Sequence, residues 1–112
     1  MKRVMLLASE EMCDHLRAAL DDKYITLPCS DPATGGELLE QKPDALILDL
    51  FLPGTDGVAF LKAHAADLPP VILAITRFIS DGLLQELEAL GVSSVVLIPC
   101  IVSYLRDQLA KY

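Results

Sequence analysis

Asp49 is the side chain whose setting in this sequence points most directly to chemistry. It stops the apolar run of residues 45–48, and a Pro-Gly loop and a helix start follow at once in the segment PDALILDLFLPGTDG. Such a run predicts a buried strand, and α/β proteins hold their ligands at the carboxyl ends of their strands. The alternative is that Asp49 merely ends a strand and caps a turn. One strand considered alone does not exclude this alternative.

The elements that would position Asp49 follow a regular alternation of short apolar runs and helical patterns. The expected strands are Val4–Leu7, Tyr24–Pro28, Ala45–Leu48, Val71–Ile75 and Val95–Leu97. The expected helices are Glu10–Leu20, Pro32–Gln41, Asp56–Ala65, Asp81–Leu90 and Ile101–Lys111. Ser9 is expected to cap the first helix, Asp31 with Pro32 to begin the second, and Gly91 to end the fourth.

This alternation predicts one α/β domain over residues 1–112. The third to fifth strands read as continuous apolar runs, which are typical of parallel strands buried on both faces. Right-handed crossovers leave few topologies, and the doubly wound order 2-1-3-4-5 brings the ends of the first and third strands together. We therefore expect a flavodoxin-like (βα)5 fold with Asp49 at that edge. Nucleotide and flavin binders fit the same pattern.

Composition narrows the function classes. The chain has 9 basic and 16 acidic residues and a net charge of −7, so its field repels phosphate backbones and disfavours direct nucleic-acid binding. No apolar stretch approaches the roughly 20 residues that span a bilayer, so we expect no membrane contact and a cytoplasmic location. Cys13, Cys29 and Cys100 are an odd number without a close pair, and we interpret them as core residues.

The segment around Asp49 resembles the phosphoacceptor segment of CheY-like receiver domains of response regulators, which act in two-component phosphorelay signalling. That pattern is a hydrophobic strand, Asp, two residues, Leu-Pro-Gly, one residue and Asp-Gly. The resemblance covers essentially the whole chain and implies that Asp49 is the phosphoacceptor. The matching residues are Asp49, Leu52, Pro53, Gly54, Asp56 and Gly57.

Four positions depart from what the resemblance implies. Receivers end the first strand with two acids that hold Mg²⁺, and these fall at Ala8 and Ser9. They end the fifth strand with a Lys, which is replaced here by Ile98, and they place an aromatic switch residue where this chain has Val95. The sequence therefore predicts a degenerate receiver, or pseudo-receiver.

Other positions keep the pattern or offer substitutes. Thr76 supplies the expected switch hydroxyl, and Pro99 matches a Lys-Pro pair whose peptide bond is typically cis. Glu10 and Glu11 are candidates to assist a metal, although solvated residues of a first helical turn are the simpler interpretation. Arg77 is a candidate to replace part of the missing cation.

The fourth and fifth helices carry more apolar residues than one stripe packed on a sheet requires. Receivers commonly use these helices for dimerisation or for contact with an output domain. We expect part of this surface to face a protein partner, either another protein or a second copy of the chain. The expected interface residues are Leu84, Ile101, Tyr104 and Leu105.

These observations support three functional hypotheses. The first is a non-enzymatic, degenerate receiver that acts through protein contacts with a histidine kinase or an output domain and needs no cofactor. The second is a phosphorylatable receiver, with Asp49 accepting phosphate in the presence of Mg²⁺ and controlling an output such as transcription. The third is a small-ligand or flavin-binding domain, which the acids at Glu10 and Glu11 disfavour because they lie where a phosphate would sit. The chain fits a stand-alone module or the N-terminal domain of a longer regulator.

Overall fold

The computed structural model describes residues 1–52, 54–99 and 102–112. Three residues named in the sequence predictions lie outside these ranges. They are Pro53 of the phosphoacceptor pattern, Cys100 as a core residue and Ile101 as an interface residue.

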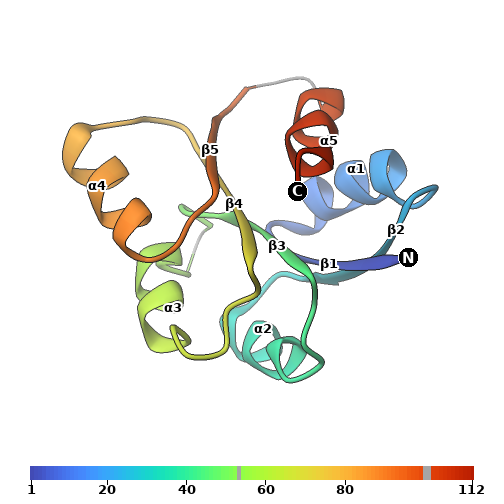
Figure 1. Cartoon of the computed structure of the whole chain (residues 1–112), viewed down its shortest axis with the longest axis horizontal. Coiled ribbons are helices and arrows are strands. Elements are labelled where there is room, and N and C mark those ends of the chain that lie inside the picture. The colour runs from blue at the N-terminus through green and yellow to red at the C-terminus, as the bar shows by residue number, and fades with distance from the viewer. Residues whose placement is uncertain (53, 100–101) are drawn as a thin grey trace.

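Five strands and five helices alternate along the described chain, as predicted (Figure 1). In order they are β1 (Lys2–Leu7), α1 (Glu10–Leu20), β2 (Tyr24–Cys29), α2 (Pro32–Leu39), β3 (Ala45–Asp49), α3 (Gly57–Ala63), β4 (Val71–Thr76), α4 (Asp81–Ala89), β5 (Ser94–Leu97) and α5 (Val102–Ala110). The ends differ from the predictions by a few residues; α2, for example, ends at Leu39 instead of Gln41. No helix among the described residues is long and apolar enough to cross a membrane.

The sheet is entirely parallel and has the order β2-β1-β3-β4-β5, which confirms the predicted doubly wound fold. Helices α1 and α5 cover one face, and α2, α3 and α4 cover the other (Figure 1). One expectation was wrong: β5 is not buried on both faces. It is an edge strand in which only Val96 is buried, while Leu97 is 49% exposed.

Side-chain alternation along the strands divides the interior into two cores. In β1, Val4 and Leu6 pack on the α1 and α5 side, whereas Met5 and Leu7 pack on the side of the other three helices. All four side chains are 0% exposed. A central strand buried on both faces therefore needs a continuous apolar run.

The predicted helix ends are confirmed by their hydrogen bonds. The side chains of Ser9 and Asp31 each accept a hydrogen bond from the backbone N–H three residues later, at 3.1 and 2.8 Å. At the end of α4, the N–H of Val92 donates to the carbonyl of Leu87 at 3.0 Å across Gly91, as in a Schellman motif.

Cys13 and Cys29 are buried, as expected of core residues. Burial raises the pKa of the Cys29 thiol to about 12, and it also raises the pKa of Cys13. Both thiols therefore stay protonated near neutral pH, which makes them poor nucleophiles and poor metal ligands.

Candidate functional site

The register of the central strands brings the predicted site residues to one edge of the sheet. Leu7 pairs with Leu48, and Asp49 pairs with Ile75. Ala8, Asp49 and Thr76 consequently follow one another across the carboxyl ends of β1, β3 and β4. This is the edge at which doubly wound folds hold their ligands.

Asp49 is half-buried at the end of β3. Its Oδ1 accepts a hydrogen bond from the N–H of Phe51 at 3.0 Å, which starts the turn after the strand. Among the described residues, this is the one hydrogen-bond partner of the Asp49 carboxylate. The side chain therefore helps to cap a turn, yet its carboxylate remains partly open to solvent.

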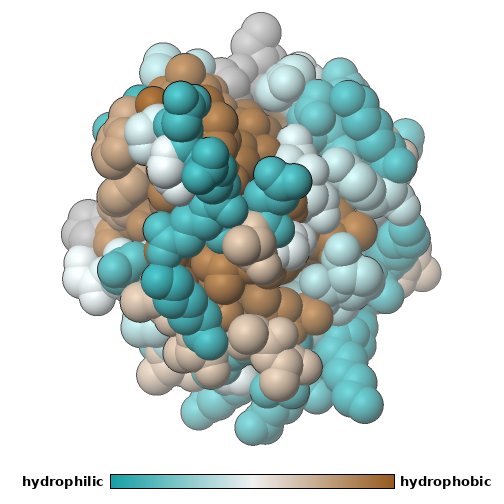
Figure 2. All heavy atoms as spheres, turned by 60° about the vertical axis from the view of Figure 1, so that its left-hand side comes forward, coloured by the Kyte–Doolittle hydropathy of each residue, from teal (hydrophilic) through white to brown (hydrophobic). Residues whose placement is uncertain are grey.

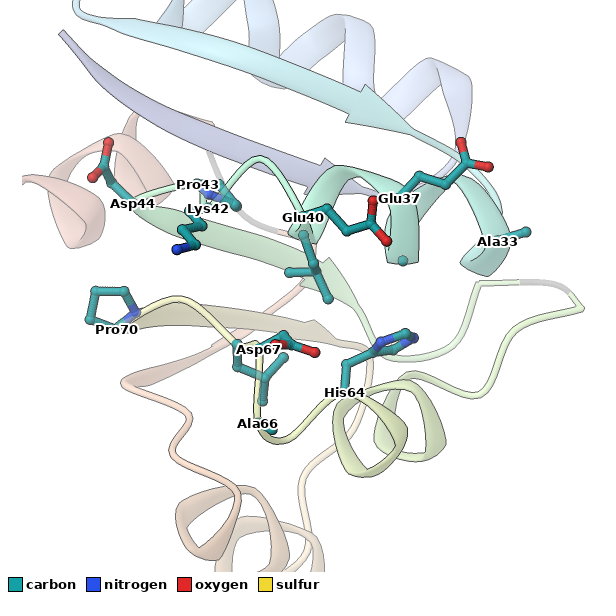
Figure 3. A pocket seen from close by; sticks show the side chains of 13 residues that line it. Ala33, Glu37, Glu40, Lys42, Pro43, Asp44, His64, Ala66, Asp67 and Pro70 are labelled. Atoms are coloured by element: carbon teal, nitrogen blue, oxygen red, sulfur yellow. The ribbon is translucent and has the colours of Figure 1, made fainter.

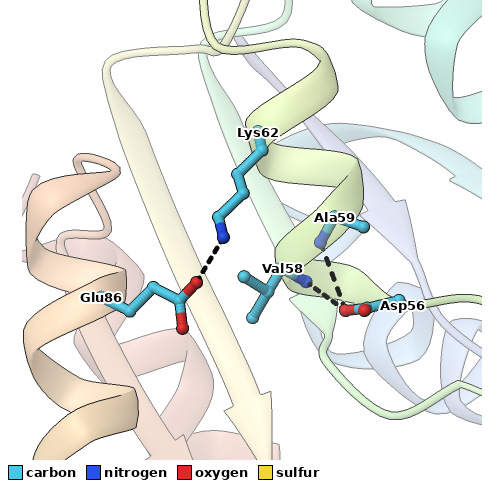
Figure 4. A network of polar contacts seen from close by, with 5 residues as sticks. All are labelled: Asp56, Val58, Ala59, Lys62 and Glu86. Atoms are coloured by element: carbon cyan, nitrogen blue, oxygen red, sulfur yellow. Dashed lines mark hydrogen bonds and ion pairs between the residues drawn. The ribbon is translucent and has the colours of Figure 1, made fainter.

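The rest of the phosphoacceptor pattern has structural roles that hold the loop behind Asp49. Gly54 has a φ of +77°, a conformation that side-chain-bearing residues rarely adopt. A Cβ on Gly57 would lie 2.7 Å from the Cα of Leu50, so only glycine lets α3 approach the end of β3 this closely. The carboxylate of Asp56 caps α3 by accepting hydrogen bonds from two backbone N–H groups of its first turn, at 3.1 and 3.2 Å (Figure 4).

Thr76 is fully buried, and its hydroxyl is already engaged. Oγ1 donates to the carbonyl of Phe78 at 2.8 Å and accepts from the N–H of the same residue at 3.4 Å. A phosphoryl group at Asp49 could use this hydroxyl as a donor only after the bond to Phe78 was broken.

Two phenylalanines connect the loops that follow Asp49 and Thr76. The rings of Phe51 and Phe78 lie 4.7 Å apart between centroids, tilted by 33°, and they are 45% and 55% exposed. Our sequence analysis missed this pair. The available signal was their spacing, since each follows its site residue by two positions on strands that are neighbours in the predicted order.

Three of the four positions that lack the receiver side chains have other roles near this edge. Ala8 is 0% exposed, and its N–H donates to the carbonyl of Cys29 at 3.2 Å. Ser9 caps α1. Ile98 packs against the core on the α1 and α5 side. None of them brings a charge to Asp49.

The candidate substitutes make no hydrogen bond or ion pair with Asp49 within the described part of the chain. Glu10 and Glu11 are exposed in the first turn of α1. No group of three or more His, Cys, Asp or Glu side chains within the described ranges is placed to hold a metal ion. Arg77 is exposed and makes no ion pair with another described residue. The peptide bond between Ile98 and Pro99 is cis, the geometry that the resemblance implies for this pair.

The expected partner surface is partly changed by the structure. Leu84 and Tyr104 are 36% and 49% exposed, as an interface requires. Leu105 was wrongly assigned to the interface: it is 1% exposed, because the turn of α5 points it into the core between α1 and the sheet. Leu97 of β5 is an exposed apolar residue that the sequence analysis missed, and its position on an edge strand could have indicated it. Figure 2, which brings the α4 side of Figure 1 forward, shows hydrophobic surface interrupted by hydrophilic side chains.

A large pocket formed by described residues lies away from Asp49. It has a volume of about 930 Å³ and opens between α2 and the segment after α3, where Glu40 and Asp67 face it from opposite sides (Figure 3). Pro43 and Pro70 line it just before β3 and β4 begin, so it belongs to the amino edge of the sheet. It holds neither Asp49 nor Thr76 and does not enter the chemistry of the carboxyl edge.

Similarity to proteins of known name extends over part of the chain. No protein-family model matches the chain. A protein-glutamate methylesterase/protein-glutamine glutaminase 2 of Pseudomonas syringae pv. tomato is 30% identical over 78 residues, which are 69% of this chain and 22% of that protein. Sporulation initiation phosphotransferase F of Bacillus subtilis is 28% identical over 74 residues, or 65% of this chain and 60% of that protein. The chain thus spans about a fifth of the length of the methylesterase relative.

The solved structures give a fuller match. Chemotaxis protein CheY4 of Vibrio cholerae superimposes with a TM-score of 0.88 and 23% identity, covering 99% of this chain and 98% of that one. The chain therefore has the fold of a signal receiver domain. The methylesterase activity is part of that relative's name, and the similarity covers 22% of that protein.

Proposed function

We propose that this receiver domain is a degenerate signalling module that acts through protein contacts, without conventional Mg²⁺-supported phosphorylation at Asp49. The observation that carries the proposal is the isolation of the Asp49 carboxylate. The positions that carry the acids and the Lys in the receiver pattern hold Ala8, Ser9 and Ile98 here, which offer neither an acid nor a cation.

The chemistry of phosphoryl transfer explains why this isolation matters. Acceptance of a phosphoryl group by a carboxylate depends mainly on positioning and charge neutralisation. Mg²⁺ needs oxygen ligands in near-octahedral geometry, and one carboxylate supplies few of them. Replacing the Lys by Ile98 also removes a charge-assisted hydrogen bond worth roughly 1.5–3 kcal/mol to a phosphorylated state.

The switch from Asp49 to the surface is altered as well. Thr76 would have to give up the hydrogen bond that its hydroxyl donates to the carbonyl of Phe78 before it could donate to a phosphoryl oxygen. Val95, at the position of the aromatic relay, is half-buried against the core on the α4 side and has no ring to move. Protein contact at the surface is therefore the better-supported route for a signal.

The contact surface that we assign consists of Leu84 on α4, Leu97 on β5 and Tyr104 on α5, and we call it the α4–β5–α5 face. These side chains are 36%, 49% and 49% exposed. Apolar side chains at such exposure fit the core of a protein interface. The partner is a histidine kinase, an output domain or a second copy of the chain, while the net charge of −7 disfavours nucleic acid.

One observation favours a second candidate function. The Asp49 carboxylate is half-buried and uses Oδ1 for its turn, so the group keeps room for an attacking role. In this alternative Asp49 accepts phosphate from a histidine kinase or a small phosphodonor, with Glu10 or Glu11 assisting Mg²⁺.

A titration with Mg²⁺ and then beryllofluoride, followed by backbone amide NMR, separates the two functions. We expect the amide shifts of Asp49, Thr76 and Val95 to stay flat while the spectrum remains that of a folded protein. Asp49→Asn is the matched control, since it removes the charge and keeps the shape. Saturable shifts that disappear in Asp49→Asn would refute the degenerate receiver and establish the phosphorylatable one.

A further inference from the structure

A second pocket lies at the carboxyl edge, on the side of the sheet covered by α1 and α5. Its volume is about 620 Å³, within the range of roughly 300–1,000 Å³ that is typical of small-molecule sites. It is lined by Met12, His15, Arg77, Ile98, Pro99, Val102 and Leu105.

The walls of this pocket are apolar and anchored in the core. Met12, Ile98 and Val102 are half-buried against the α1 and α5 core, and Leu105 closes the pocket as a buried residue. Ile98 contributes to this character directly, because a Lys at that position would bring a charge to the wall. The replacement that removes a cation from the receiver pattern thus gives this pocket an apolar wall.

The charge at the pocket is opposite to that of the whole chain. His15 and Arg77 are its two ionisable lining residues, and no Asp or Glu lines it although the chain has 16 acidic residues. The larger pocket, by contrast, has Glu40 and Asp67 on its walls. Arg77 makes no ion pair with a described residue, so its charge is not neutralised locally.

We infer that this pocket binds a small amphipathic anion, with an apolar body against Met12, Ile98 and Val102 and a carboxylate at Arg77. The planar guanidinium presents paired N–H donors that match a carboxylate, and the open rim leaves the ligand partly solvated. Burial of the apolar body supplies most of the binding free energy, and Arg77 supplies the selectivity for an anion. This site is independent of phosphorylation at Asp49, so its failure would leave the proposed function untouched.

Titration of the 112-residue chain with 1-naphthoate, followed by backbone amide NMR, tests the inference. We expect saturable shifts that cluster at Met12, Ile98 and Val102. Arg77→Gln is expected to weaken the binding of 1-naphthoate roughly tenfold or more, as for the loss of a charge-assisted hydrogen bond. The neutral analogue 1-naphthalenemethanol should bind wild type and Arg77→Gln equally.

Arg17→Gln is the matched control. Arg17 is also exposed and lies on α1, but it lines a different pocket. The Arg17→Gln substitution removes the same charge from the chain as Arg77→Gln does, so a general electrostatic effect would weaken the binding of 1-naphthoate in both variants. Equal weakening by Arg17→Gln and Arg77→Gln, shifts scattered over the sheet, or no saturation at millimolar 1-naphthoate would overturn the inference.

Discussion

Two aspartates that follow strands in this protein show how an acid that caps a turn differs from one that stays available. Asp31, after β2, uses both oxygens on one residue: Oδ1 accepts from the N–H of Thr34 at 2.8 Å, and Oδ2 accepts from the hydroxyl of Thr34 at 2.9 Å. Asp49 uses Oδ1 alone, for the N–H of Phe51. The capping interpretation therefore accounts fully for Asp31 and only in part for Asp49.

The pH dependence of stability should report the role of Asp31. Its hydrogen bonds to Thr34 hold the pKa of the Asp31 carboxyl below its ordinary value of 3.8, so the folded state releases this proton more readily than the unfolded state. The contribution of Asp31 to stability is then fully present above the ordinary pKa and is lost as pH falls through the lowered one.

We expect the difference in free energy of unfolding between wild type and Asp31→Asn to be independent of pH above about 4. In more acidic solution, the free energy of unfolding of wild type should fall relative to that of the variant. Urea unfolding of both proteins at a series of pH values measures this difference, and the other carboxylates cancel because both proteins contain them. A difference that does not change with pH would show that Asp31 has no special role as an ionised cap.

The isolation of Asp49 predicts that metal-dependent chemistry can be restored by returning side chains to the edge. In the double variant Ser9→Asp with Ile98→Lys, Asp can still cap α1, and the stem of Lys can lie along the apolar surface while its ammonium reaches out. We expect Mg²⁺-dependent beryllofluoride shifts at Asp49 and Thr76 in this variant and none in wild type, measured by amide NMR. If the triple variant that also carries Asp49→Asn gave the same shifts, the restored site would not be at Asp49.

Among the elements, α4 meets the core through a small set of apolar side chains. Leu87 is its one buried residue among those described. An exposed ion pair of 2.6 Å between Lys62 and Glu86 joins it to α3 (Figure 4). The Glu86 carboxylate raises the pKa of Lys62, but exposed pairs of this kind add little to stability. The position of α4, and with it that of Leu84, therefore depends on Leu87 together with Leu83, which packs partly buried against the same core.

Leu87→Ala should destabilise the protein by about 2–5 kcal/mol, because it removes a fully buried side chain and leaves a cavity. Leu84→Ala, on the exposed side of the same helix, should change the free energy of unfolding by less than about 0.5 kcal/mol. Urea unfolding of both variants provides the test. Equal losses would mean that Leu84 is packed in solution, against another part of the chain or another molecule.

Across the whole molecule, the fold was predictable because its signals are local. Ser9 and Asp31 indicate helix starts by their residue type, and the apolar runs around Val4 and Ile47 indicate strands buried on both faces. The wrong burial prediction for a strand, β5, came from an apolar run on an edge strand, where pairing with β4 leaves one side open.

The site was predictable in its position but not in its contacts. Sequence spacing located Asp49 and Thr76, and register then placed them at one edge. The hydrogen bond of Thr76 to Phe78 and the stacking of Phe78 on Phe51 depend on how two loops fold back, which no periodicity encodes. The rotation of α5 likewise decides that Leu105 is buried, and a helical pattern alone does not fix it.

The two edge strands allow a matched test of self-association through the α4–β5–α5 face. Leu97 on β5 and Ile25 on β2 are 49% and 47% exposed at opposite edges of the sheet. Glu at either position adds the same charge and removes similar apolar area. If a second copy is the partner, we expect Leu97→Glu to shift the chain towards monomer in sedimentation equilibrium at high concentration, because a buried unpaired carboxylate disfavours the interface. Ile25→Glu should sediment as wild type does. A wild type that stays monomeric would reject the second copy, and a shift caused by Ile25→Glu alone would move the interface to the β2 edge.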